Sequence, residues 1–67
     1  MTSGLDLKLE RTAQRVTGTA VARAMGITPS RISAVEAYAV VTPEMVARYR
    51  AAIATCVRER TSAEADA

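Results

Sequence analysis

The sequence predicts a compact all-α domain, a bundle of four or five helices. Hydrophobic residues make up 49% of the 67 residues but aromatic residues only 3%. With alanine abundant, this composition favours closely packed helices over a sheet. Signals for helix starts recur along the chain, most clearly at the Thr-Pro pairs that begin at Thr28 and Thr42. Apolar residues recur at spacings of three and four, and no segment has the length of a strand.

The first helix is predicted to begin at Ser3 or Asp6, either of which can cap it, and to end near Gln14 or Arg15. The residues before it are expected to lack structure. One apolar stripe is expected to face the core, and Leu7 lies off this stripe. The stripe consists of Leu5, Leu9, Ala13 and Val16.

Two short helices are predicted between residues 17 and 36. Thr17 caps the first of them, and Gly26 ends it in the left-handed conformation that glycine adopts at little cost. Thr28 caps the next helix, and Pro29 occupies its first position, where the missing N–H costs nothing. The residues expected to face the core are Ala20, Val21, Ala24, Met25, Ile27, Ile32 and Val35. Those expected on the outside are Arg23, Pro29, Ser30, Arg31, Ser33 and Ala34.

Thr42 and Pro43 open a last helix, predicted to end near Arg60, after an apolar connector over residues 37–41. Residues 1–60 are predicted to form the domain, and residues 61–67, which are small and polar, a disordered tail. Residues 43–60 would span roughly 27 Å. The rest of a chain this small cannot cover a helix of that length. We therefore expect a homodimer, with an apolar stripe of this helix as its interface: Tyr49, Ile53, Cys56 and Val57.

Residue usage argues against several classes of site. Cys56 is the single cysteine and histidine is absent, which excludes an internal disulfide and a Cys/His zinc site. No acid/base pair, metal-ligand set or phosphate-binding loop is found, so we expect neither an enzyme nor a cofactor. No stretch approaches the roughly 20 apolar residues of a membrane span. We expect a cytoplasmic protein that does not act on membranes.

The charge is unevenly distributed. The chain carries a net charge of +2, but residues 1–60 hold nine bases against five acids, a net charge of +4. Eight of the nine bases are arginine, which can make forked contacts with phosphate and with guanine. The excess is small, so by itself it is only a weak indication of nucleic-acid binding.

The most specific pattern is the run Val-Ala-Arg-Ala-Met-Gly-Ile-Thr over residues 21–28, followed by Ile-Ser-x-Val-Glu over residues 32–36. It resembles the Cro/C1-type (XRE) helix-turn-helix family, and the resemblance extends over roughly residues 9–53. It implies a lambda-repressor-like fold and a protein similar to small phage Cro proteins and immunity repressors. Two places depart from the family. Gly18 stands where Gln is common, and residues 38–40 replace a glycine followed by a basic residue.

The resemblance also implies which side chains meet DNA. The third helix would lie in the major groove, and its candidate base-contacting residues are Thr28, Pro29, Ser30, Arg31, Ser33 and Ala34. For Arg31, a guanine and a flanking phosphate remain open as targets. The candidate backbone-contacting residues are Thr17, Thr19 and Arg23. Glu36, by contrast, is expected to have a structural role, bonding to an arginine or to backbone.

These features predict a sequence-specific transcriptional regulator that binds double-stranded DNA, most simply a repressor that acts by occupying its operator. As a homodimer it would place two recognition helices roughly 34 Å apart on a palindromic operator. Two alternatives stay open. The chain could be an antitoxin that also binds a toxin, or a protein–protein adaptor that keeps the fold without binding DNA. In both, the connector over residues 37–41 is an expected partner surface, and for the adaptor the end of the last helix is expected to contribute as well.

Overall fold

The computed structural model describes the backbone of residues 1–66 and the side chains of residues 1–60. The described chain contains four helices and no strand, which confirms the predicted all-α class. The helices are α1 (Gly4–Ala13), α2 (Gly18–Met25), α3 (Pro29–Glu36) and α4 (Pro43–Asp66).

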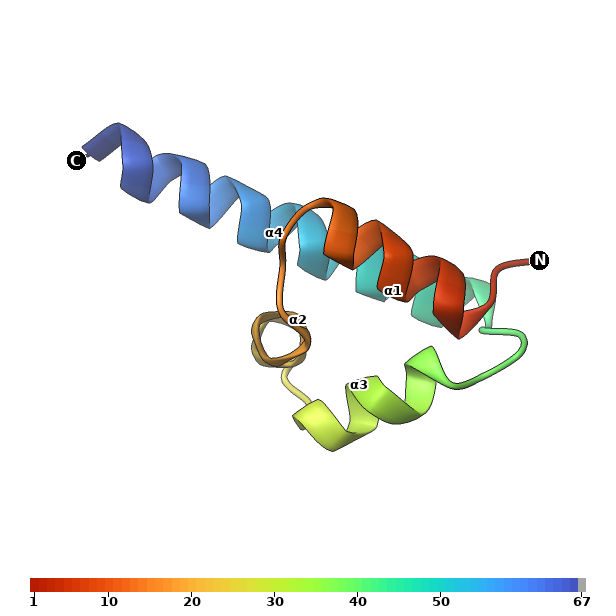
Figure 1. The fold of residues 1–67 in the computed structure, drawn as a ribbon. Helices are drawn as coiled ribbons and strands as arrows, with labels where there is room; N and C mark the ends of the chain where they lie inside the picture. The colour runs from red at the N-terminus through yellow and green to blue at the C-terminus, as the bar shows by residue number, and fades with distance from the viewer. Residues whose placement is uncertain (67) are drawn as a thin grey trace.

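The helices form one small bundle in which α4 is the longest element (Figure 1). α1 packs along α4, α2 contacts both α4 and α3, and the amino-terminal end of α1 meets α3. In Figure 1, α2 is seen nearly end-on while α3 lies across the view, so these two helices cross steeply. The carboxy-terminal part of α4 extends beyond the other helices, which accounts for the 40 Å long dimension of the molecule.

The core is entirely apolar. Residues from all four helices and from two connecting segments contribute to it, and among the described residues no polar or charged residue is fully buried. Its members are Leu7, Val16, Val21, Ala22, Ile32, Val35, Val41, Val46, Tyr49, Ala52 and Ile53. The inward positions expected for Val21, Ile32 and Val35 are therefore confirmed. For the second helix, however, Ala24 is exposed and Ala22 is buried in its place.

Of the apolar stripe expected on the first helix, Val16 is buried as predicted, but the other three positions are wrong. Leu5 and Leu9 are 58% and 59% exposed, whereas Leu7, which lies off the stripe, is completely buried. The reason is a contact at the start of the helix, where Gly4 lies against the backbone of residues 35 and 36. That contact turns Gly4, Leu7 and Arg11, at helical spacings of three and four, toward the other helices.

The first residues are ordered, contrary to expectation. The Val41 amide donates to the Thr2 carbonyl at 2.8 Å, and the Gly4 amide donates to the Tyr38 carbonyl at 2.8 Å. Ser3, one of the two predicted caps, accepts from the Asp6 amide at 3.1 Å, and the Asp6 carboxylate accepts from the Ser3 amide at 3.0 Å. These reciprocal bonds form a capping box, and they hold the pKa of Asp6 below its usual value.

α4 continues to Asp66, six residues past the expected end at Arg60. No glycine or proline follows Arg60 to stop it, and the next residues include the helix formers alanine and glutamate. The predicted disordered tail covers residues 61–67. The side chains of residues 61–66 and the whole of Ala67 lie outside the described part of the chain. No helix in the described residues is both long enough and apolar enough to cross a membrane.

We predict opposite effects of the same substitution at two helix starts. A Cβ at Gly4 would lie 2.2 Å from the Val35 carbonyl oxygen and 2.4 Å from the Glu36 carbonyl carbon. These are backbone atoms, so Gly4→Ala must push α1 away from α3, and we expect a loss of about 1–3 kcal/mol in the free energy of unfolding. Urea denaturation measures this loss.

Gly18→Ala is the matched control, because Gly18 also begins a helix. Its Cβ would meet the Ile32 Cγ2 atom at 3.7 Å and the Arg11 Cζ atom at 3.9 Å, which are ordinary contacts. We expect this variant to be unchanged or up to about 1 kcal/mol more stable, because alanine loses less backbone entropy on folding. Equal stabilities for the two variants would contradict the close approach described at Gly4.

Candidate nucleic-acid interface

α2 and α3 are joined by a three-residue turn whose backbone hydrogen bonds are local. The Thr17 side chain caps α2 by accepting from the Ala20 amide at 3.1 Å. Gly26 ends α2 with φ 71° and ψ 29°, the left-handed conformation predicted for it. Thr28 then caps α3 by accepting from the Arg31 amide at 3.3 Å, with Pro29 in the first turn. The sequence thus predicted the boundaries of this unit correctly.

The inner sides of α2 and α3 are fixed by the core. Val21 and Ala22 of α2 and Ile32 and Val35 of α3 are at most 2% exposed. Ile27, in the turn, is half-buried against the same cluster. Because each helix is short and one side is fully committed to packing, the orientation of its opposite side is also fixed.

The start and the outer side of α3 carry all the side chains that we predicted to contact bases. Every one of them is exposed: Thr28, Pro29, Ser30, Arg31, Ser33 and Ala34. Apart from Arg31 they are small, so the α3 backbone can closely approach another surface. Ser30 and Ser33 offer hydroxyl groups that donate and accept hydrogen bonds.

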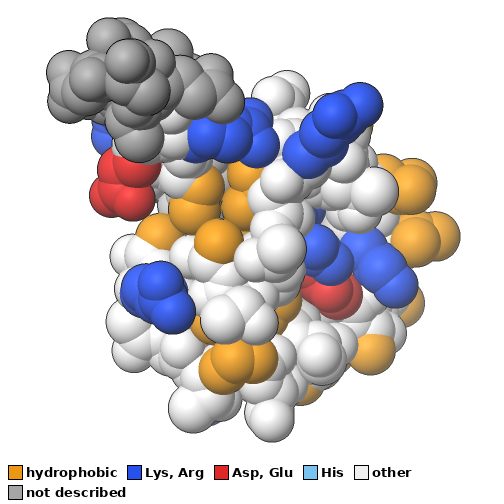
Figure 2. All heavy atoms as spheres, turned by 60° about the vertical axis from the view of Figure 1, so that its left-hand side comes forward, with side chains coloured by type: hydrophobic (Ala, Val, Ile, Leu, Met, Phe, Trp, Pro, Cys, Tyr) orange, Lys and Arg blue, Asp and Glu red, His pale blue; other side chains and the backbone are white. Residues whose placement is uncertain are grey.

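The predicted backbone-contacting residues are also exposed. Thr17 and Thr19 lie at the start of α2, and Arg23 lies near its end. The Thr17 oxygen already accepts a bond from the Ala20 amide, so its hydroxyl hydrogen is left to donate. On the face drawn in Figure 2, basic side chains are spread out rather than gathered in one strong patch, in keeping with the modest net charge.

A network of three polar side chains holds the end of α3. The Arg11 Nε atom donates to the Glu36 Oε2 atom at 2.9 Å, and Arg11 Nη2 donates to Oε1 at 3.3 Å. The Tyr49 hydroxyl donates to the same Glu36 carboxylate, and Arg11 Nε also donates to the Tyr49 oxygen at 3.2 Å. Arg11 Nη1 donates to the Val16 carbonyl at 2.9 Å. The structural role expected for Glu36 is therefore confirmed.

The network shifts the protonation equilibria of its members. Burial alone would raise the pKa of Glu36, but the hydrogen bonds from Arg11 and Tyr49 outweigh it and hold that pKa below its usual value. Burial and the bond to Glu36 raise the pKa of Tyr49. The bond to Glu36 raises the pKa of Arg11. At neutral pH Tyr49 is therefore a neutral phenol, and Arg11 and Glu36 form an ion pair.

The network corrects one predicted role. We expected Tyr49 at a dimer interface, but its side chain is completely buried within one chain and bonded to Glu36. Cys56 also points inward, with its Sγ atom 3.6 Å from the Ala20 carbonyl oxygen. Ile53 is only 7% exposed, and Val57 is half-buried. The expected stripe is therefore largely the inner side of α4, because α2 packs on it.

A second set of exposed apolar side chains lies on the N-terminal residues, including α1, and on the connector between α3 and α4. Within residues 1–60, the large apolar side chains that are more than half exposed all lie on the first nine residues or on the connector over residues 37–41. The bonds from Gly4 to Tyr38 and from Val41 to Thr2 hold these two segments together. The residues are Met1, Leu5, Leu9, Tyr38 and Val40, which we call the N-terminal apolar surface.

The described residues contain no group of three or more histidine, cysteine, aspartate or glutamate side chains that could hold a metal ion. Comparison of the chain with protein-family models, with curated proteins and with solved structures finds no match. The resemblance to the Cro/C1-type family therefore rests on the residues quoted above.

We predict that Glu36→Gln costs about 3 kcal/mol in the free energy of unfolding, because it leaves the largely buried Arg11 without its counter-charge. Glu10→Gln is the matched control, because Glu10 pairs with Arg50 through two 3.0 Å bonds but on an exposed surface. That variant should cost less than about 1 kcal/mol. Urea denaturation gives both values, and similar costs would contradict a special role for the buried pair.

We also predict how stability depends on pH. Because the pKa of Glu36 is lowered on folding, its contribution to stability is present above the ordinary glutamate pKa of 4.5 and is lost as the pH falls through the lower pKa of the folded state. The unmodified chain should therefore lose stability in acid more steeply than Glu36→Gln does. Asp6, whose pKa is also lowered, contributes to both proteins alike. If the unfolding free energies of the unmodified chain and of Glu36→Gln fell in parallel with decreasing pH, Glu36 would not be the group that carries this acid dependence.

Proposed function

We propose that this chain is a sequence-specific transcriptional regulator that binds double-stranded DNA, with α2 and α3 as a lambda-repressor-like helix-turn-helix. The observation that carries the proposal is the outer side of α3. It is exposed, and apart from Arg31 its side chains are small, while its inner side is packed into the core. A helix of this kind can lie deep in a major groove, about 12 Å wide, where larger side chains would hold it away from the bases.

Each side chain of α3 has a chemical role in this proposal. Ser30 bonds to a base edge, and the Ala34 methyl group packs against a thymine methyl. Arg31, at the first turn of α3, has the reach for a guanine or for the neighbouring phosphate. Glu36 takes no part in reading, because its carboxylate is occupied by Arg11 and Tyr49.

Phosphate contacts come from α2 in this proposal. Thr17, Thr19 and Arg23 are exposed, and the amides at the start of α2 favour an anion. The Cro/C1-type family often has Gln at the position of Gly18, which offers no side chain to a phosphate. The connector over residues 37–41 also lacks the basic residue that the family often has there. We therefore expect modest affinity for a single chain. Regulation then follows from occupancy of a promoter, most simply as repression, and requires no chemistry from the protein.

Substitutions on α3 test base reading. Ser30→Ala and Arg31→Ala should each weaken binding to cognate DNA by about 1–3 kcal/mol and should weaken binding to scrambled DNA less. Fluorescence anisotropy with duplexes from beside the chain's own gene measures both affinities. Arg48→Ala is the control, since it removes an exposed arginine from α4. Equal losses on both DNAs would show that these side chains only hold phosphate.

Salt dependence separates DNA binding from its main alternative. Binding through phosphates should weaken with a log–log slope of about −0.9 for each phosphate neutralised. That slope should fall by about one in Arg23→Ala if this arginine holds a phosphate. A slope near zero, or equal affinity for native and scrambled duplexes, would contradict an operator-reading role.

A second candidate function is favoured by the N-terminal apolar surface. Exposed apolar side chains gathered on one part of a small domain are a common mark of protein contact. In this alternative the chain is an antitoxin or an adaptor, and the surface that includes Tyr38 and Val40 binds a protein partner. Such binding should change little with salt, and Leu9→Lys should abolish it while leaving α3 untouched.

A further inference from the structure

Arg15, in the turn between α1 and α2, is the single residue other than glycine with a positive φ among the described residues. Its φ is 57°, in the left-handed region that glycine adopts at much lower cost. Hydrogen bonds fix the backbone around it: the Arg15 amide donates to the Thr12 carbonyl at 3.0 Å, and the Val16 amide donates to the Arg11 carbonyl at 3.1 Å. Glycine would therefore suit this backbone better than arginine. A side chain kept at a strained position points to a role of its own.

A second guanidinium group lies at the same turn. Arg60 of α4 donates from its Nη1 atom to the Arg15 carbonyl oxygen at 3.4 Å, although the two residues are 45 positions apart. Both side chains are exposed, and within residues 1–60 neither has a carboxylate within ion-pair distance. The fold thus brings two cations to one turn, and no acid from the described side chains neutralises either of them.

This turn leads directly into the start of α2 (Figure 1). The residues there, Thr17, Gly18 and Thr19, carry no charge, and Arg23 lies near the other end of the helix. The Thr17 hydroxyl, two residues after Arg15, has a hydrogen left to donate. Any cation that meets an anion at the start of α2 must therefore come from outside this helix.

We propose that Arg15 and Arg60 together hold one phosphate of the DNA backbone beside the start of α2. Arg60 uses one N–H group on the Arg15 carbonyl and keeps the others for the ligand, and Arg15 offers its whole guanidinium. Each side chain can make a forked contact with phosphate oxygens. An anion between the two also offsets the repulsion of like charges. The inference rests on the proposed function, because its ligand is the backbone of the DNA that α3 reads.

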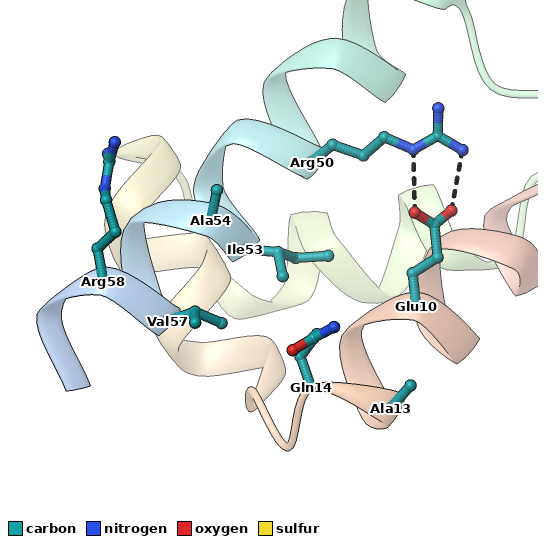
Figure 3. Close-up of a pocket in the computed structure, with 8 residues that line it drawn as sticks. All are labelled: Glu10, Ala13, Gln14, Arg50, Ile53, Ala54, Val57 and Arg58. Carbon is teal, nitrogen blue, oxygen red and sulfur yellow. Dashed lines mark hydrogen bonds and ion pairs between the residues drawn. The ribbon is translucent and has the colours of Figure 1, made fainter. Parts of the chain in front are cut away.

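Arg58 provides the matched comparison. Like Arg60 it is an exposed arginine of α4 without a carboxylate partner within residues 1–60. Its Nη2 atom donates to the Thr55 hydroxyl at 3.3 Å. It borders an open hollow between the end of α1 and α4, where its side chain points away from Gln14 (Figure 3). We therefore expect no phosphate contact from Arg58.

Arg15→Gly separates a role in phosphate binding from a structural one. The variant should resist urea better than the unmodified chain, because glycine adopts the left-handed conformation at lower cost. It should nevertheless bind duplex DNA about five- to tenfold more weakly at roughly 0.1 M salt, the contribution of one neutralised phosphate. The loss should be the same on native and on scrambled duplexes, because a phosphate contact carries no sequence information.

A salt series with fluorescence anisotropy counts the contacts. The log–log slope should become shallower by about one in Arg15→Gly and in Arg60→Gln. Arg15→Lys should keep most of the slope, because it retains the charge. Arg58→Gln should bind with the slope of the unmodified chain.

The two readouts tell this inference apart from the proposed function. Preference for the native duplex tests base reading, whereas the slopes of the variants test the arginine pair. Selective binding with unchanged slopes in Arg15→Gly and Arg60→Gln would overturn the pair and leave the proposed function standing. A slope that becomes equally shallow in Arg58→Gln would also overturn it. Equal affinity for both duplexes, with slopes changed as expected, would support the pair and contradict base reading, and no binding to either duplex would overturn both.

Discussion

The arrangement of the helices depends on the Arg11 guanidinium. It bonds at once to Glu36 at the end of α3, to Tyr49 of α4 and to the Val16 carbonyl in the segment before α2. A domain of this size buries only about 60% of the surface that its unfolded chain exposes, so its apolar core offers a limited margin of stability. In such a domain one satisfied polar network fixes orientation as well as contributing energy, because its bonds are directional.

That constraint reaches the proposed DNA interface through α3. The start of α3 is set locally by Gly26 and Thr28, and its end by the carboxylate of Glu36. Gly4 also contacts this end of α3, because the lack of a side chain lets the start of α1 lie directly against the backbone of residues 35 and 36. With both ends held and the inner side packed, the exposed hydroxyl and methyl groups of α3 have a fixed direction. A rigid presentation of this kind is what base reading requires, since each contact is a hydrogen bond or a close apolar fit.

Local signals were enough to predict where the helices of the α2–α3 unit begin and end. Caps, glycine and proline act within a few residues, so Thr17, Gly26, Thr28 and Pro29 could be interpreted from the sequence alone. The burial of Leu7 and Tyr49 could not be predicted in this way. Leu7 is buried because Gly4 lies against the backbone of residues 35 and 36, and a periodic pattern of apolar residues gives no sign of such a contact. The Tyr49 hydroxyl donates to Glu36, which is distant along the chain. An arginine and a glutamate 25 residues apart give no sequence signal of a pair. The exposure of the predicted DNA-facing residues was anticipated, but their contact with DNA remains a proposal.

The most direct test of the central proposal is to map the backbone amide NMR shifts of the chain as it is titrated with a duplex from beside its own gene. The largest changes are expected on residues 17–19, on Arg23, on Thr28 and on residues 30–34, with small changes at Tyr38 and Val40. Changes confined to residues 1–9 and 38–41, or no changes at all, would contradict DNA reading by α3. The first of these results would instead favour the N-terminal apolar surface as the functional one.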